Sequence, residues 1–188
     1  KVERSEERPG GAANVARNCA SLGAETGLLS VVGSDEAGQI LAKLLDDSGI
    51  SASLHEDPKL STTVKLRVVG RQQQLLRIDF ENQPGHEVLN AKLAEFDQRL
   101  TECDVVILSD YGKGGLTHIT EMIRRARLAG KPVLADPKGD DYTRYAGASV
   151  LTPNRAELRQ VVGGWSDEAD LVRRAQALRH ELGLEALL

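Results

Sequence analysis

Cysteines are scarce in this sequence and long apolar segments are absent, and each shortage excludes a class of protein. The 188 residues include two cysteines, Cys19 and Cys103, which form neither a CxxC pair nor a cluster with histidine. This spacing argues against a disulfide framework or a metal centre, and we interpret both as small buried side chains. No apolar run reaches the roughly 18 to 20 residues that span a bilayer, and the first residues lack a signal-peptide core. We therefore expect a cytoplasmic protein with no membrane partner.

Basic residues are also in short supply. Lysine and arginine together number 24, against 28 aspartates and glutamates. This balance leaves no positive surplus to follow a nucleic-acid backbone, so we expect no nucleic-acid partner. Hydrophobic residues make up 40% of the chain and charged residues 28%, which is enough apolar material for one domain with a buried core.

Short apolar strands alternate with amphipathic helices along most of the chain. The patterns predict helices at 12–22, 35–48, 88–100, 117–129, 154–162 and 167–182. They predict apolar strands at 26–32, 105–108, 132–135 and 150–151, and a further core strand at 184–188. Continuous apolar strands between helices are typical of a parallel sheet with both faces covered. The predicted fold class is therefore α/β, with a mostly parallel sheet sandwiched by helices.

Residues 62–80 depart from this alternation. Two stretches of alternating polar and apolar residues flank Gly70-Arg71-Gln72, a composition that predicts an antiparallel hairpin. Lys65 and Arg67 would share one face of the first strand, and Arg77 would lie on the second strand. A small sheet with a cationic face could close as a lid over an anionic substrate. The alternative is that these charges form the solvated face of an ordinary hairpin.

The other face of the predicted hairpin is apolar. It would present the side chains of Leu66, Val68, Leu76 and Ile78. An exposed apolar surface of this kind is typical of contacts between protein chains. We therefore predict that a homodimer would form through the hairpin.

A glycine-rich turn near the beginning of the chain leads directly into the first predicted helix. Gly10 and Gly11 have no Cβ atoms, which allows a ligand to approach the backbone closely. The free N–H groups of the helix's first turn would point toward that ligand. Asn14 adds a carboxamide that can both donate and accept hydrogen bonds, which suits a polyhydroxyl compound. Considered without its spacing, the same run is also consistent with a simple turn before a core helix.

Polar residues follow three successive predicted strands at the point where each strand ends. Because ligands bind outside the carboxyl ends of strands in open α/β sheets, these residues are candidates for one binding site. They are Asp110 and Lys113, Asp136 and Lys138, and Asn154 and Glu157. Lysines can neutralise phosphates, whereas carboxylates can orient hydroxyls or hold the waters of Mg²⁺. The alternatives are local: Asp136 would begin a turn, and Asn154 with Glu157 would form a capping box.

The spacing of the glycine-rich segment is specific. Gly10-Gly11-Ala12-x-Asn14-x-Ala16 is followed after six residues by Gly23 and after nine more by Gly33. This pattern resembles the first sugar-kinase signature of the ribokinase-like family, also called PfkB. Later segments are similar, in content and order, to one branch of that family, the heptose 7-phosphate kinases: TTVKLRVVGRQQQLLRIDF, LSDYGKGGL, LADPKGDDYTRY and LTPNRAEL.

The resemblance implies a ribokinase-like kinase with a small antiparallel β lid, and it implies ATP, Mg²⁺ and a sugar phosphate as partners. In the implied reaction, the γ-phosphoryl group of ATP moves to the anomeric hydroxyl of D-glycero-β-D-manno-heptose 7-phosphate. The 1,7-bisphosphate product would serve ADP-heptose and lipopolysaccharide core synthesis. Two alternatives stay open: another sugar kinase of this family, acting on ribose, fructose or fructose 1-phosphate, and a sugar-phosphate-binding module without catalysis.

The resemblance also implies roles for individual residues. Gly10, Gly11 and Asn14 match the family's sugar-binding segment. Asn154 and Glu157 match its Asn-x-x-Glu motif near Mg²⁺ and the phosphates, where Glu157 would act on the metal indirectly. From charge and placement, we predict substrate-binding roles for Lys65, Arg67, Arg77, Asp110 and Lys113. By the same reasoning, Asp136 and Lys138 are predicted to bind the nucleotide or its phosphates.

One family motif does not occur in these 188 residues. Members of the family have a Gly-Ala-Gly-Asp sequence whose glycines form an anion hole and whose Asp is the catalytic base, and this sequence is not found here. We therefore expect residues 1–188 to be a partial kinase domain, truncated at both ends, with 62–80 as its lid. Because phosphoryl transfer depends on positioning and charge stabilisation, these residues alone are expected to have no turnover.

Overall fold

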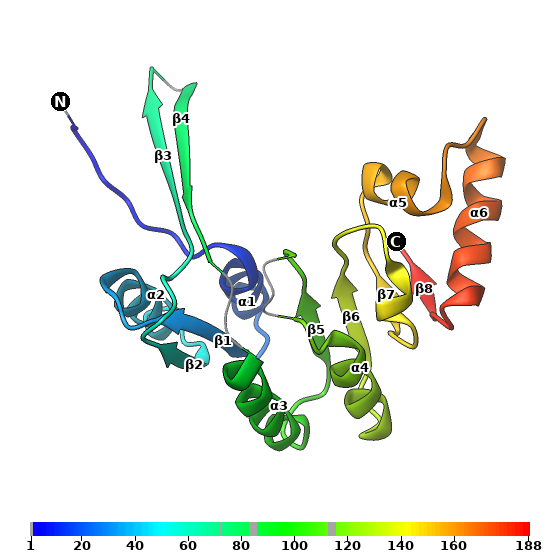
Figure 1. Ribbon diagram of the computed structural model, residues 1–188, viewed down its shortest axis with the longest axis horizontal. Helices are drawn as coiled ribbons and strands as arrows, with labels where there is room; N and C mark the ends of the chain where they lie inside the picture. Colours follow the sequence, from blue (N-terminus) through cyan, green and yellow to red (C-terminus); the bar gives the residue numbers. More distant parts are fainter. Residues whose placement is uncertain (1, 72, 83–85, 113–115) are drawn as a thin grey trace. The chain divides into compact units, whose positions relative to one another are not determined.

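The structure, a computed structural model, describes residues 2–71, 73–82, 86–112 and 116–188, and the predicted site residue Lys113 lies outside them. The chain divides into two compact units, Lys1–Val88 and Leu89–Leu188. Both units combine helices with parallel strands, so the predicted α/β class is confirmed (Figure 1). The assignment of 1–188 to one partial domain stays a prediction.

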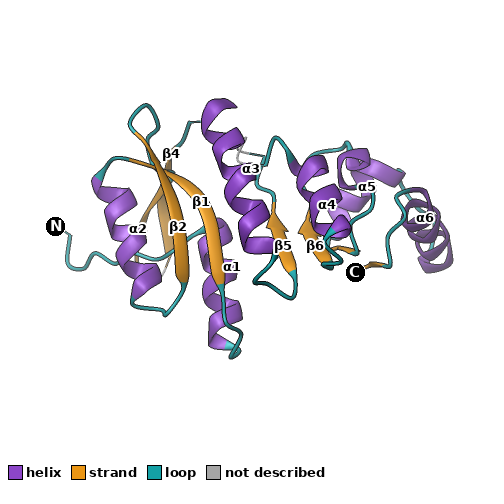
Figure 2. Ribbon diagram, turned by 90° about the horizontal axis from the view of Figure 1, so that it is seen from below, coloured by secondary structure: helices purple, strands orange, loops and turns teal. Residues whose placement is uncertain are grey.

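The described part of the first unit contains two helices, two parallel strands and a hairpin. They are α1 (Gly11–Ser21), β1 (Gly27–Gly33), α2 (Glu36–Asp46), β2 (Ser51–Asp57), β3 (Val64–Gly70) and β4 (Gln73–Phe80). The α1 helix packs on β1, and α2 packs on both β1 and β2 (Figure 2). Their apolar side chains form a buried cluster, which consists of Ala13, Ala16, Leu28, Leu45 and Ile50.

The α2 helix begins as its sequence predicts, whereas β2 was not predicted. The Asp35 side chain caps α2 by accepting a hydrogen bond from the Gly38 N–H (2.8 Å). The residues of β2, SASLHED, contain no continuous apolar run and read as a loop. Parallel pairing with the apolar β1 makes this segment a strand, with Gly27 opposite Ser51.

The predicted hairpin is confirmed, and its alternation is preserved. Leu66 lies opposite Ile78 and Lys65 opposite Asp79, so apolar and polar side chains occupy opposite faces. Arg71, with a φ of +49°, lies in the turn. The hairpin extends as a two-stranded arm from the rest of its unit, and every residue of β4 is exposed (Figure 1).

A partly buried polar contact fixes the base of this arm. The N–H and the hydroxyl of Thr62 donate to the two carboxylate oxygens of Asp35 (2.8 and 2.7 Å). The Thr62 hydroxyl also accepts a hydrogen bond from the Gly33 N–H (2.8 Å). Gly33 has no room for a side chain, because a Cβ atom there would collide with the carbonyl oxygen of Leu60. The first residues of the hairpin are therefore tied to the end of β1 and the start of α2.

The second unit contains a sheet of parallel strands that pair in the order in which they occur in the chain. The chain enters this unit through α3 (His86–Leu100). The elements that follow are β5 (Val106–Ser109), α4 (Ile119–Leu128), β6 (Val133–Asp136), the 3₁₀ helix η1 (Tyr142–Tyr145), β7 (Val150–Leu151), α5 (Arg155–Val162), α6 (Glu168–Glu181) and β8 (Ala186–Leu187). The predicted elements of this region are confirmed to within a few residues, whereas η1 was not predicted.

The core of the second unit lies between this sheet and its helices. Ile119 and Ile123 of α4, Val133 of β6 and Leu151 of β7 are each 1% exposed or less. Full burial of such side chains contributes roughly 1.5 to 3 kcal/mol each to stability. Because the strands are parallel, their carboxyl ends lie at the same edge of the sheet.

The burial of the two cysteines differs from the prediction. Both Cys19 and Cys103 are free and only half-buried, so the prediction that they are buried is wrong. On α1, the buried face is formed by the smaller Ala13 and Ala16, and Cys19 lies beside that face. Within the described ranges, no helix is both long enough and apolar enough to cross a membrane.

Candidate active site

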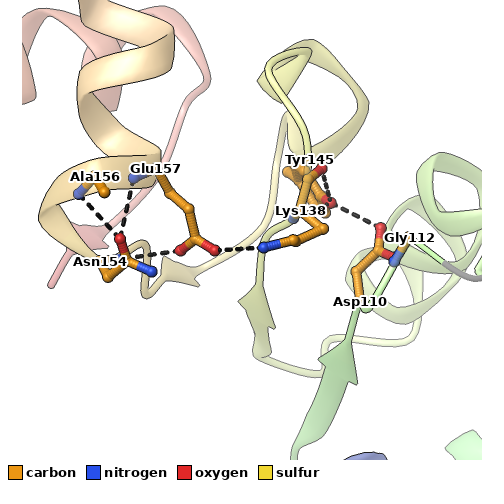
Figure 3. A network of polar contacts seen from close by, with 7 residues as sticks. All are labelled: Asp110, Gly112, Lys138, Tyr145, Asn154, Ala156 and Glu157. Carbon is orange, nitrogen blue, oxygen red and sulfur yellow. Dashed lines mark hydrogen bonds and ion pairs between the residues drawn. The ribbon is translucent and has the colours of Figure 1, made fainter. Parts of the chain in front are cut away.

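The carboxyl ends of β5, β6 and β7 bring predicted residues of the second unit together. Ser109 lies opposite Asp136 in the paired strands, and the N–H of Asp110 donates to the Asp136 carbonyl (3.1 Å). At the end of β7, the Thr152 N–H donates to the carbonyl of Ala135 (3.1 Å). The loops that follow these strands therefore begin side by side (Figure 3).

Asp110, the first residue after β5, is a carboxylate with only 5% exposure. One of its oxygens accepts a hydrogen bond from the Gly112 N–H (2.8 Å), and the other accepts one from the Tyr145 hydroxyl (2.7 Å). The guanidinium of Arg144 lies 3.5 Å from the second oxygen. A buried carboxylate is stable only when donors and an opposite charge surround it, and these groups meet that requirement.

The Tyr145 hydroxyl connects Asp110 to the neighbouring loop. It donates to Asp110 and accepts a hydrogen bond from the backbone N–H of Lys138 (2.9 Å). Its side chain is fully buried, and this burial raises the pKa of Tyr145 well above the usual value. The phenol therefore stays protonated at neutral pH and continues to donate.

The side chain of Lys138 extends to the third loop. Its ammonium lies 3.0 Å from Oε1 of Glu157, while Oε2 accepts a hydrogen bond from the Asn154 N–H (3.0 Å). In return, Oδ1 of Asn154 accepts hydrogen bonds from the N–H groups of Ala156 (2.9 Å) and Glu157 (3.0 Å). The capping box considered as the local alternative is thus confirmed. It uses one oxygen of Glu157 and leaves the other for Lys138.

The charges at this edge favour a cation. Burial acts to raise the pKa of Glu157, but hydrogen bonds from Asn154 and Lys138 outweigh it and hold this pKa below its usual value. Burial, followed by the negative charge of Glu157, raises the pKa of Asp136. Together with Lys138, these two carboxylates leave a net negative charge when ionised, and such a charge attracts cations.

The carboxylates at this edge are compatible with a hydrated Mg²⁺. The described residues contain no group of three or more histidine, cysteine or acidic side chains that could hold a metal. Both oxygens of Glu157 already accept hydrogen bonds. Mg²⁺ keeps several waters and binds substrate phosphates, so it needs few protein ligands. Asp136 and Glu157 are therefore suited to hold the waters of such an ion.

In the first unit, the predicted sugar-binding residues lie at the beginning of α1. Gly10 is exposed, and a Cβ atom added there would meet open space. Gly11 has a φ of +50°, in the left-handed region that favours glycine. Asn14 is half-buried one turn later, and its Oδ1 accepts a hydrogen bond from Arg17 (3.3 Å). Because Gly10 has no side chain to cap the helix, the backbone N–H groups of the first turn can serve a ligand.

The predicted phosphate-binding cations of the hairpin are exposed. Lys65 and Arg67 alternate along β3, and Arg77 of β4 lies directly opposite Arg67. Arg77 also forms an ion pair with Asp79 (3.0 Å). Like charges placed opposite each other destabilise a sheet unless an opposite charge compensates them. Asp79 compensates the charge of Arg77, so the anion-binding role and the solvated face both stay predictions.

Sequence reasoning missed Arg144 and Tyr145, which the structure places against Asp110. Tyr145 is 35 residues away from Asp110 in the chain, and η1 carries it back to the strand ends. One signal could have revealed it, because the two tyrosines of DDYTRY directly follow the candidate loop Asp136–Lys138. A single short helical turn after that loop is enough to direct a tyrosine toward the same edge.

Residues 1–187 match the pfkB family of carbohydrate kinases, and the chain belongs to this family. It is 50% identical over all 188 residues to the D-beta-D-heptose 7-phosphate kinase of Bordetella bronchiseptica, of which it spans 60%. It is equally 50% identical over 188 residues to the bifunctional protein HldE of Chromohalobacter salexigens, of which it spans 40%. The resemblance described from the sequence is therefore confirmed, and the chain spans about half the length of these curated relatives.

Solved structures share the fold. Phosphofructokinase-2 from Escherichia coli in complex with fructose-6-phosphate matches with a TM-score of 0.75 at 19% identity, over 100% of this chain and 66% of that one. Arabidopsis thaliana ribokinase complexed with ribose and ATP matches with a TM-score of 0.71 at 18% identity, over 94% of this chain and 58% of that one. The predicted ribokinase-like fold is confirmed.

Proposed function

We propose that this chain is part of an ATP-dependent kinase that phosphorylates D-glycero-β-D-manno-heptose 7-phosphate at its anomeric hydroxyl. The observation that carries the proposal is 50% identity, along the whole chain, to a protein named as a heptose 7-phosphate kinase. The product would be the 1,7-bisphosphate, used in the cytoplasm for ADP-heptose and lipopolysaccharide core synthesis.

The first unit would bind the sugar phosphate. Gly10 and Gly11 would admit the sugar against the helix N-terminus, and the Asn14 carboxamide would donate to and accept from its hydroxyls. The cationic face of the hairpin would bind the 7-phosphate, because phosphate oxygens would compensate the opposed charges of Arg67 and Arg77. A homodimer formed through the apolar face of the hairpin is part of the same proposal.

The second unit would bind the phosphates of ATP. The Lys138 side chain is half exposed, and its ammonium could exchange Glu157 for a phosphate oxygen when ATP binds. Asn154 would fix Glu157 during this exchange through the capping box. Asp110, aided by Lys113, would orient the sugar. A bound Mg²⁺ would neutralise charge on the ATP phosphates, with Asp136 and Glu157 holding its waters.

The fold leaves a second candidate, a kinase for a different sugar. Ribokinase and phosphofructokinase-2 share this fold at 18% and 19% identity, so the fold does not select the acceptor. Ribose, fructose and fructose 1-phosphate are the acceptors to compare. A module that binds sugar phosphates without turnover is the remaining alternative.

An acceptor panel tests the proposal on the whole natural polypeptide that contains these residues. With ATP and Mg²⁺ present, we expect kcat/KM for heptose 7-phosphate to exceed that for the other sugars by at least about 100-fold. Phosphorus NMR of the product should show a phosphate on the anomeric carbon. Preference for another sugar would establish the second candidate, and binding without turnover would establish the module. The 188 residues alone are predicted to show no turnover in the same assay.

A further inference from the structure

Two neighbouring tyrosines behind the strand ends have similar burial but different surroundings. Tyr142 and Tyr145 are 2% and 0% exposed, and their rings meet edge to face with centroids 5.7 Å apart. The Tyr145 hydroxyl has partners on two loops. Among the residues that the structure describes, the Tyr142 hydroxyl has no hydrogen-bond partner. Comparison of the two residues therefore separates the effect of a bridging hydroxyl from the effect of a hydroxyl that is only buried.

We propose that Tyr145 is a positioning residue of the kinase site, whose hydroxyl joins the loop after β5 to the loop after β6. Through this bridge it orients the Asp110 carboxylate and fixes the backbone of Lys138. The inference rests on the proposed function and deepens it, because it adds a residue that acts through two predicted substrate-binding groups.

The geometry of the hydroxyl is that of a bridge. Its single proton is donated to Oδ2 of Asp110 (2.7 Å), which lies nearer than the Lys138 carbonyl oxygen (3.2 Å), and a lone pair accepts from the Lys138 N–H (2.9 Å). The backbone bond from Asp110 N–H to the Asp136 carbonyl (3.1 Å) aligns the strand ends themselves. Tyr145 provides the next connection outward, where side chains would meet substrates (Figure 3).

Removal of the hydroxyl would release both loops. Of the partners given by the described residues, Oδ2 of Asp110 would keep Arg144, at 3.5 Å, and the Lys138 N–H would lose its acceptor. Buried groups left without partners move or rehydrate to regain hydrogen bonds. Because the ammonium of Lys138 meets Glu157, this movement would extend from the sugar side to the nucleotide side.

The test compares Tyr145→Phe with Tyr142→Phe in the whole natural polypeptide. Each variant loses one buried hydroxyl from the same short helix. We expect Tyr145→Phe to raise the KM for the sugar phosphate and for ATP by about tenfold each, with kcat within about threefold. Tyr142→Phe should leave both KM values within about twofold. Thermal unfolding of each variant gives the folded fraction, so that the kinetics refer to folded protein.

Equal KM changes in the two variants would overturn the proposal. So would an unchanged KM in Tyr145→Phe with only a lower melting temperature, because the hydroxyl would then have a purely structural role. A double-mutant cycle with Asp110→Asn gives an independent measurement. If Tyr145 acts through Asp110, the double variant will have nearly the sugar KM of Asp110→Asn, whereas multiplied effects would contradict the proposal.

The acceptor in these assays is whichever sugar phosphate the wild type uses best. A failure of the heptose assignment would therefore leave the test of Tyr145 intact. If the wild type binds substrates without turnover, dissociation constants from calorimetry replace the KM values, with the same expected ratios.

Discussion

The two units place their predicted site residues in opposite environments. Asp110 and Glu157 of the second unit are wholly or partly buried, and every carboxylate oxygen of this pair accepts a hydrogen bond. Lys65 and Arg67 of the first unit are exposed on a hairpin. The strand-end site is thus organised by the protein itself, whereas the hairpin cations would be organised by the ligand that they bind.

This difference has a physical cause and a consequence. A buried carboxylate must find donors when the chain folds, whereas an exposed cation is satisfied by water. Substitutions in the strand-end site should therefore affect stability and binding together, and substitutions of the exposed hairpin cations should affect binding alone. The expected loss of stability decreases from the buried Asp110 to the exposed hairpin cations.

The largest loss is expected for Asp110→Ala. This change removes the acceptor of Gly112 and Tyr145, and each buried group left unsatisfied costs about 1 to 3 kcal/mol. The kcat/KM for the sugar phosphate should fall about 100-fold because the surrounding loops lose their alignment. Urea unfolding and steady-state kinetics measure the two effects. Asp110→Asn, which keeps one acceptor, should lose less stability, and equal losses in both variants would contradict this account.

A smaller loss, about 1 to 2 kcal/mol, is expected for Thr62→Val at the base of the hairpin. The hydrogen bonds from Thr62 hold the pKa of Asp35 below its ordinary value. The stabilisation is therefore complete above that ordinary value, about pH 3.9, and is lost as the pH falls through the lowered pKa. Urea unfolding at several pH values should show a variant deficit that is full at pH 7 and shrinks in acid. A deficit independent of pH would show that Asp35 does not mediate it.

Glu157→Gln should cost below about 1 kcal/mol, because its partner Lys138 is half exposed and the amide oxygen can still complete the capping box. The KM for ATP should nevertheless rise about tenfold, and more Mg²⁺ should be needed for half-maximal rate. Glu168→Gln is the matched control, since Glu168 forms an exposed ion pair with Arg155 (3.1 Å). If both variants need the same Mg²⁺ concentration for half-maximal rate, Glu157 does not act at the nucleotide site.

The smallest change in stability, within about 0.5 kcal/mol, is expected when Lys65 and Arg67 are both replaced by alanine. The KM for the sugar phosphate should rise and the KM for ATP should not, and the rise should diminish at high salt. Lys43→Ala, at an exposed lysine of α2 in the same unit, serves as the control. If the double variant keeps its sugar KM, the hairpin charges form only a solvated face.

Much of the fold could be predicted from local patterns. The hairpin follows from alternation around Gly70, and α2 begins within one residue of its predicted start. The elements that were missed have weak local patterns: β2 is polar along most of its length, and η1 is a single short turn. Each forms because of what it packs against, and a short sequence window contains no record of that neighbour.

The features of the candidate site fall into the same two groups, those set by local sequence and those set by distant contacts. The sequence alone determined the types of group at the strand ends, the capping box of Asn154 and Glu157, and the alternating charges of the hairpin, because these depend on neighbours within a few residues. Only the tertiary structure decided that Lys138 pairs with Glu157 and that Tyr145 binds Asp110, contacts between residues 19 and 35 positions apart. Such contacts depend on the parallel pairing of β5, β6 and β7, which brings together residues that are distant in the chain.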